Sequence, residues 1–217
     1  LMYQAQGWFF ADQDTHFAHM ISKNIKKGGP AEYQQPVRHK SFEFVKDFGI
    51  AVDIGANVGL WSRDLARRFA HVIAIEPVVE FQECLQRNVP MENIEIWPIA
   101  LGTEDTTIDM IITEGNTGHS HINKNTIGSG QVKMKRLDSC MFDRIDYMKI
   151  DCEGYEMQIL KGGENIIRTH EPVIVVEQKL HEDTGITKET QYGCVDLLKS
   201  WGARELGRVR NDCILGW

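Results

Sequence analysis

Hydrophobic positions divide the chain near residue 50. Beyond that point, short apolar runs alternate with segments in which apolar residues such as Leu60, Leu65 and Phe69 recur at helical spacing. This alternation predicts an α/β fold: a doubly wound, mostly parallel sheet with helices on both faces. The strands are expected in AVDIG (51–55), HVIAIEP (71–77), IEIWPIAL (94–101), YMKIDCEG (147–154) and PVIVVEQ (172–178).

Three passages modify this simple alternation. TTIDMIIT (106–113) and QVKMKRLD (131–138) flank a glycine-rich loop and predict an inserted strand pair. Pro98 lies within the third apolar run, and because proline has no N–H to give to a neighbour, that strand is expected at a sheet edge. The last segment, RELGRVRNDCILGW (204–217), predicts a closing hairpin that turns at its Asn-Asp pair.

The first 48 residues differ from the rest in pattern. Acidic capping residues and aromatic side chains predict two short helices, Thr15–Asn24 and Arg38–Phe48. We therefore expect residues 1–48 to form a helical cap on the main domain, residues 49–217, as part of the same folding unit. Trp8 and Tyr33 could line a substrate pocket, although core packing is the favoured expectation for both.

Composition narrows the function classes. The 217 residues carry a net charge of −7, which argues against binding driven by nucleic-acid phosphates or a membrane surface. No apolar run approaches the roughly 20 residues that a bilayer span needs. The five cysteines include no C-x-x-C pair, and no secretion signal is evident, so a cytoplasmic protein with reduced thiols is expected.

The first predicted strand ends in VDIGANVG and leads directly into a helix. Gly55 permits a tight turn, Asn57 is among the few non-glycine residues that tolerate positive φ, and Gly59 allows close approach. The N-terminus of the following helix is expected to present free N–H groups to a carboxylate or phosphate. Glu76, at the end of the second strand, can accept hydrogen bonds from both hydroxyls of a ribose. These features indicate a nucleoside cofactor.

S-adenosylmethionine fits this loop better than NAD does. A dinucleotide site needs G-x-G-x-x-G, whose second glycine admits the pyrophosphate. Here Asn57 occupies that place, and Asp53 precedes the turn, where it would repel a pyrophosphate. The same carboxylate would attract the amino group of a methionine tail and the nearby sulfonium.

Carboxylates also follow the later strands. Asp151 and Glu153 end the fourth strand, Glu177 ends the fifth, and His181 follows shortly after. If the first, fourth and fifth strands are neighbours, these groups line one rim of the sheet, where they could supply a general base or hold a divalent cation. Lys149 could instead neutralise one of them in a structural ion pair.

An H-x-H pair, His119 and His121, lies in the glycine-rich insert. Two such side chains can bind a metal, but without a third ligand nearby a polar or solvated loop is favoured. We expect no metal site there.

These motifs together resemble the FkbM family of methyltransferases, a branch of the class I S-adenosylmethionine-dependent enzymes. The resemblance runs from about residue 38 to residue 177. It is carried, in order, by VDIGANVG, IEP, the Ala-Leu-Gly that ends the third strand, the glycine-rich insert, RLD, KIDCEGYE with ILKGG, and PVIVVE. KIDCEGYE followed by ILKGG is the most specific of these.

The resemblance implies a Rossmann-like sheet of seven strands with one reversed strand. It implies S-adenosylmethionine as cofactor and O-methylation of a sugar or other small hydroxyl compound. The N-terminal cap and the C-terminal tail match nothing in the family and are expected to choose the acceptor. The implied cofactor contacts are Asp53, Gly55, Asn57 and Gly59 at the methionine end, Glu76 with Pro77 at the ribose, and Ala100 with Leu101 near the adenine.

We therefore predict an in-line transfer of a methyl group to an acceptor hydroxyl. Asp151 or Glu177 would serve as the base, with Glu153 or His181 orienting the acceptor. Three alternatives remain open: a magnesium-assisted O-methyltransferase, a non-catalytic S-adenosylmethionine-binding protein, and an oxidoreductase.

Overall fold

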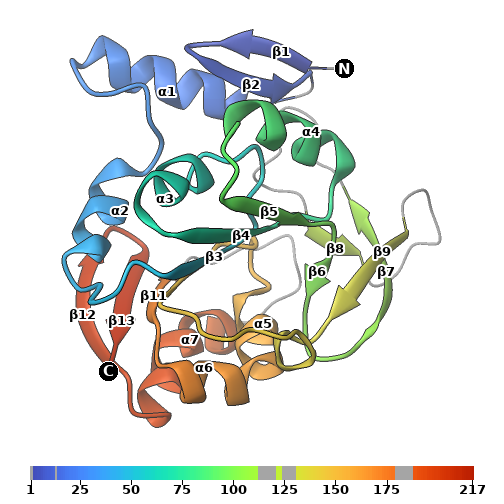
Figure 1. Ribbon diagram of the computed structural model, residues 1–217, viewed down its shortest axis with the longest axis vertical. Helices are drawn as coiled ribbons and strands as arrows, with labels where there is room; N and C mark the ends of the chain where they lie inside the picture. Colours follow the sequence, from blue (N-terminus) through green and yellow to red (C-terminus); the bar gives the residue numbers. More distant parts are fainter. Residues whose placement is uncertain (1, 13, 112–120, 124–130, 179–187) are drawn as a thin grey trace.

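The protein is built on a central seven-stranded sheet, as the sequence predicts (Figure 1). The computed structural model describes residues 2–12, 14–111, 121–123, 131–178 and 188–217. The strand order is β12-β13-β11-β10-β3-β4-β5, and only β13 runs antiparallel to its neighbours. The strands are β3 (Ile50–Ile54), β4 (His71–Ile75), β5 (Ile94–Trp97), β10 (Tyr147–Ile150), β11 (Val173–Glu177), β12 (Arg204–Val209) and β13 (Asp212–Gly216).

Helices cover both faces of this sheet. Figure 1 shows α3 and α4 on one side and α5, α6 and α7 on the other. Alternate strand residues point to opposite faces, so Val52 and Ile54 pack in one buried cluster while Ala51 packs with Trp61 and Leu65 in another. No helix in the described ranges has the length and apolarity needed to cross a membrane. The helices are α1 (His16–Lys26), α2 (Gln35–Phe42), α3 (Ser62–Arg68), α4 (Val79–Asn88), α5 (Glu156–Gly162), α6 (Glu164–His170) and α7 (Lys188–Ser200).

The predicted inserted strands belong to a second sheet with the order β6-β9-β7-β8. The run expected as one strand over 94–101 is divided at Pro98: β5 ends at Trp97 on the edge of the main sheet, and β6 pairs with β9 instead. The edge position of β5 confirms the expectation from Pro98. The four strands are β6 (Ala100–Leu101), β7 (Thr106–Ile111), β8 (His121–Asn123) and β9 (Gln131–Lys135).

The N-terminal region is not purely helical, and this part of the prediction is wrong. It begins with a β-hairpin of β1 (Met2–Ala5) and β2 (Trp8–Ala11) before the two helices. Gln6 and Gly7 form its two-residue turn, both with positive φ, which matches the right-handed twist of paired strands. The Gln-Gly pair between two apolar runs is the sequence signal that could have revealed this hairpin.

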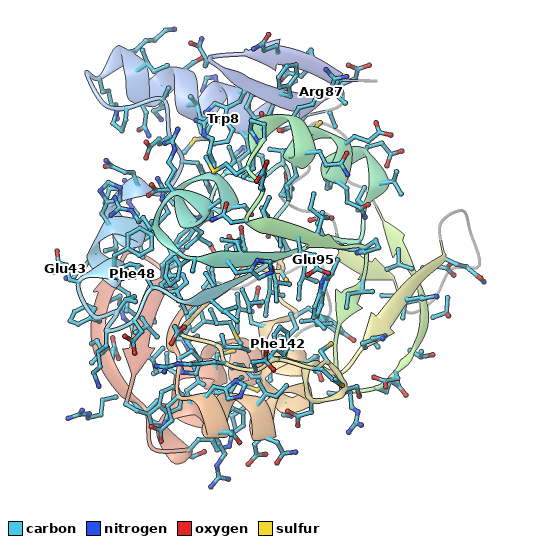
Figure 2. All side chains as sticks on the ribbon, viewed as in Figure 1. Trp8, Glu43, Phe48, Arg87, Glu95 and Phe142 are labelled. Carbon is cyan, nitrogen blue, oxygen red and sulfur yellow. The ribbon has the colours of Figure 1, made fainter. Side chains whose placement is uncertain are left out.

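The hairpin and α1 lie over α4, at the top of the molecule in Figure 1. They form a buried apolar cluster in which Trp8, Phe10 and Ile21 pack with Val58 and Phe81 of the main domain. Figure 2 shows Trp8 on the side of the hairpin that faces the rest of the molecule, consistent with its 1% exposure. The N-terminal region therefore packs directly on the predicted cofactor loop and the helix beside it.

Candidate active site

The loop between β3 and α3 has the backbone that its sequence predicts. Gly55, Asn57 and Gly59 all have positive φ, at 76°, 49° and 88°. A Cβ on Gly55 would lie 2.1 Å from the main-chain oxygen of Asp151, so glycine is required for the close approach of the loop to the end of β10. A Cβ on Gly59 would lie 3.1 Å from Cγ of Leu85, which shows that this glycine accommodates α4.

The amide groups of this loop donate hydrogen bonds within the protein. Gly55 and Ala56 donate to the Ile75 oxygen, Asn57 donates to Glu76, Val58 donates to the Asn57 side chain, and Gly59 donates to the Ala56 oxygen. The free N–H groups expected at the N-terminus of α3 stay a prediction, whereas the amides of residues 55–59 are hydrogen-bonded within the protein. The reason is the short turn, which folds the amides back onto β4 and onto the loop itself.

Glu76 is buried at the end of β4 and shapes the loop. Its Oε2 accepts a hydrogen bond from the Asn57 amide at 2.8 Å, and its Oε1 accepts one from the Val78 amide at 2.9 Å. Burial raises the pKa of Glu76 to about 7, although the two amide donors pull the pKa down. An ionised carboxylate can accept about four hydrogen bonds, so two positions remain for a ligand.

Buried Asp53 and Lys149 and half-buried Asp151 form a row beside the loop. Asp53 and Lys149 are partners in the register of β3 and β10, and the Lys149 Nζ lies 3.5 Å from Asp53 Oδ1 and 3.7 Å from Asp151 Oδ2. The same ammonium donates to the Gly55 oxygen at 3.0 Å, while Ser62 donates to Asp53 Oδ2 at 2.6 Å. Lys149 thus forms the predicted structural ion pair and also ties the glycine loop to β10.

The charges in this row are strongly perturbed. Burial disfavours the Lys149 ammonium, but the Asp53 and Asp151 carboxylates outweigh burial and raise the pKa of Lys149 above its ordinary value. Burial also raises the pKa of Asp151 well above its usual range; Lys149 opposes this, and Glu177 and Glu153 add to it. We attribute the raised pKa of Asp151 to burial among other acids. The Lys149 ammonium does not cancel this effect, because Lys149 is shared with Asp53. A carboxyl group with a raised pKa in such a position is a candidate for proton transfer.

A tight turn follows β10 and positions Glu153. Glu153 has a φ of 49° and Gly154 a φ of 94°, a conformation in which a non-glycine residue is strained. The buried carboxylate of Glu156 holds the turn, since its Oε1 accepts hydrogen bonds from the amides of Cys152 and Gly154 at 2.8 and 3.2 Å. No role is predicted for Glu156 from the sequence.

The expected carboxylate rim exists where β3, β10 and β11 lie side by side. Ile150 is in register with Val176, which brings Asp151 beside Glu177, and Glu177 is in register with Asp212 of β13. This confirms the neighbour relation on which the rim was predicted, whereas the catalytic roles of Asp151, Glu153 and Glu177 stay predictions. His181 and His119 lie outside the described residues, and for His121 only the backbone, in β8, is described.

Tyr33 is an additional group at this rim. Burial raises the pKa of Tyr33 above its ordinary value, and the negative charges of Asp151, Glu177, Asp212 and Glu153 add to the shift. Its phenol therefore stays protonated at neutral pH and can donate a hydrogen bond. The ring also packs edge-on against Phe17 at 5.0 Å. Core packing was favoured for Tyr33, and no pattern in the sequence links it to strands more than 100 residues away.

The remaining predicted cofactor contacts lie in the connection after β4 and in β6 of the second sheet. Pro77 follows Glu76 in the connection from β4 to α4 and is half-buried. Ala100 and Leu101 are buried in β6, paired with Met134 and Lys135 of β9. Their contacts with an adenine stay predictions.

Comparison with known proteins assigns the chain to a family. The sequence profile described as the methyltransferase FkbM domain matches residues 53–204. Methyltransferase 1 of Beauveria bassiana (strain ARSEF 2860) is 25% identical over 146 residues, which cover 54% of this chain and 59% of that protein.

Two solved structures share the fold. Methyltransferase FkbM of Methylobacillus flagellatus KT has a TM-score of 0.52 at 16% identity, covering 83% of this chain and 50% of that one. A candidate O-methyltransferase of Klebsiella pneumoniae has a TM-score of 0.51 at 11% identity, covering 94% and 90%. This chain thus spans little more than half of its fungal relative and half of the Methylobacillus structure. With the profile matching most of the chain, from the loop at Asp53 to the start of β12, this protein belongs to the FkbM methyltransferase family.

Proposed function

We propose that this protein transfers a methyl group from S-adenosylmethionine to a hydroxyl group of a carbohydrate or other small molecule. The observation that carries the proposal is the row of Asp53, Lys149 and Asp151, which joins the glycine loop to the carboxylate rim. Open α/β sheets bind their ligands outside the carboxyl ends of the strands, and this row lies at that edge. Family membership supports S-adenosylmethionine as the ligand.

The residues beside the loop suit the chemistry of this cofactor. Asp53 is fully buried, and its Oδ1 has no hydrogen-bond donor among the described residues, its nearest cation being the Lys149 ammonium. That oxygen can accept a hydrogen bond from an amino group, and the two open positions on Glu76 can accept hydrogen bonds from ribose hydroxyls. When bound, S-adenosylmethionine supplies an electrophilic methyl group on a positively charged sulfur.

The proton from the acceptor has to move to the protein or to water. Asp151 would take it from the acceptor hydroxyl, because its raised pKa makes it a better base than an ordinary aspartate. Glu177 is the second candidate base, and Glu153 or His181 would orient the acceptor. Lys149 lies 3.7 Å from Asp151 and would keep this carboxylate in place, and the rim would have to hold the reacting oxygen in line with the methyl group.

A magnesium-assisted reaction is the competing mechanism. In the ranges that the structure describes, no group of three or more His, Cys, Asp or Glu side chains is arranged to hold a metal ion. No specific observation therefore favours this mechanism. Retention of activity in EDTA would contradict it.

A screen for methyl gain tests the proposed function. The purified protein is incubated with S-adenosylmethionine carrying a deuterated methyl group and with sets of monosaccharides, glycosides, phenols and aliphatic alcohols. We expect at least one hydroxyl compound to gain the labelled methyl group in mass spectra. Binding of S-adenosylhomocysteine without any labelled product would favour a non-catalytic binding protein, and binding of NAD instead would favour an oxidoreductase.

Cofactor affinity is expected to increase with pH around neutrality. Ribose hydroxyls donate to the ionised form of Glu76, whose pKa is raised by burial to about 7. Below that pH the carboxyl is mostly protonated, so S-adenosylhomocysteine should bind about tenfold more weakly at pH 6 than at pH 8. Calorimetry across this interval measures the effect, with one proton released per ligand bound near pH 6.

Glu76→Gln is the matched control, because glutamine has nearly the same shape but does not titrate in this range. The variant should bind weakly at both pH values, with the pH dependence removed. The same slope in the variant as in the wild type would assign the titration to another group.

A further inference from the structure

Asn88 connects three separate parts of the protein. It is the last residue of α4, and it is 3% exposed. Its Nδ2 donates to the Val58 oxygen at 2.7 Å and to the Phe9 oxygen at 2.8 Å, while its Oδ1 accepts from the Phe9 amide at 2.7 Å. Both donors of the carboxamide are thus used, and each bond joins α4 to a segment distant in sequence.

Towards the N-terminal region, Asn88 substitutes for a neighbouring strand. Its carboxamide bonds both the N–H and the C=O of Phe9, the pairing that a residue of an antiparallel strand would make. Phe9 is in register with Gln4 on the hairpin's other side. The outer edge of β2 is therefore docked by a side chain of the main domain.

Towards the cofactor loop, Asn88 fixes one peptide group. Val58 lies between Asn57 and Gly59, the two residues of the loop that have positive φ after Gly55. The amide of Asn57 donates to Glu76, which is the predicted ribose ligand. Asn88 thus holds one end of a short segment whose other end is held by Glu76.

The hairpin also contacts the helix on the other side of the loop. The guanidinium of Arg63, in α3, lies 3.2 Å from the centre of the Trp8 ring and donates to the Gly7 oxygen at 3.3 Å. The hairpin is therefore attached to both helices that flank the loop, by Asn88 to α4 and by Arg63 to α3.

We infer that Asn88 is a positioning residue for the cofactor loop and that the N-terminal hairpin, held by it, is part of the cofactor-binding apparatus. The inference rests on the proposed function for the identity of the ligand. It gives the hairpin a role distinct from acceptor selection, which is the role expected for the N-terminal region from the sequence. Without Asn88, the Val58 peptide loses a donor in a buried place and the loop has more conformations to lose on binding.

Asn88→Ala tests this inference against a matched variant, Asn93→Ala. The Asn93 Nδ2 likewise donates to two main-chain oxygens, those of Ala66 and Phe69, at 2.8 and 2.9 Å, but it holds the far end of α3. Both variants should lower the melting temperature. Only Asn88→Ala should weaken S-adenosylhomocysteine binding, by about tenfold in calorimetry.

Each result decides the matter. Equal dissociation constants for the two folded variants would overturn the inference. If Asn88→Ala does not fold, Asn88→Asp keeps the volume and one acceptor but lacks both donors, and the same selective loss is expected from it. Failure of both to fold would make Asn88 a structural residue only. Absence of binding in the wild type would instead refute the proposed function, and the inference with it.

Discussion

Asp151→Asn is expected to lower methyl-transfer turnover by about 100-fold to 10,000-fold, the range typical for loss of a general base. Asparagine matches aspartate in shape but cannot accept a proton from the acceptor hydroxyl. Lys149 still has Asp53 as an ion-pair partner in this variant, so the row beside the loop should stay intact. Binding of S-adenosylhomocysteine should accordingly change little. The measurement is kcat and KM with an acceptor found by the labelled-methyl screen, together with calorimetry.

The pH profile adds a second readout for Asp151. A base works only when deprotonated, so the rate should fall as the pH decreases through the pKa of the folded enzyme. Because burial and acidic neighbours raise the pKa of Asp151, this acidic limb should lie well above the range of an ordinary aspartate. In Asp151→Asn the limb should disappear.

Glu177→Gln is the matched comparison, since Glu177 lies beside Asp151 on the neighbouring strand. We expect less than a tenfold loss of turnover from it. A larger loss there than in Asp151→Asn would make Glu177 the base. Loss of cofactor binding in parallel with rate in Asp151→Asn would make Asp151 a cofactor ligand.

The sequence predicts those features that follow from regular backbone geometry. The rim could be anticipated, on the condition that the first, fourth and fifth predicted strands are neighbours, because parallel strands bring their carboxyl ends to one edge, where Asp151 and Glu177 indeed lie. The positive φ of Asn57 follows from the small set of residues that tolerate it. The single reversed strand, β13, follows from the closing hairpin, although its turn comes at 210–211, one residue earlier than expected.

The features that could not be predicted depend on individual side chains meeting across long stretches of chain. Asn88 and Phe9 are 79 residues apart, and nothing in a hydrophobic pattern indicates that a carboxamide will pair with a particular strand edge. Glu156 was assigned no part in the site, and for Tyr33 core packing was favoured over a place in a substrate pocket, because their partners are decided by the turn and by the packing of the N-terminal region. For the same reason, the sequence does not reveal that the amides of the glycine loop donate to Glu76 and Ile75.

Lys149→Met is expected to destabilise the fold by about 3–5 kcal/mol, the usual cost of removing one partner from a buried ion pair. Methionine fills similar space but leaves the Asp53 and Asp151 carboxylates buried without their cation, and it removes the donor to the Gly55 oxygen. Urea unfolding at pH 7 measures the loss. Lys199→Met is the control: Lys199 pairs with Glu205 at 3.4 Å on the surface, where such a pair contributes at most about 1 kcal/mol.

The two variants should also differ in their response to acid. In Lys149→Met, protonation of Asp151, whose pKa burial raises, removes part of the uncompensated charge, so the difference from the wild type should shrink as the pH is lowered. In the wild type, the pKa of Lys149 is raised on folding, so its contribution is fully present below the unfolded pKa and is lost only as the pH rises through the folded value. Its stabilisation therefore does not vary between pH 5 and 8, and we attribute any pH dependence of the difference to Asp151 rather than to Lys149. A loss below about 1 kcal/mol at pH 7, or one independent of acid, would show that the carboxylates do not need Lys149.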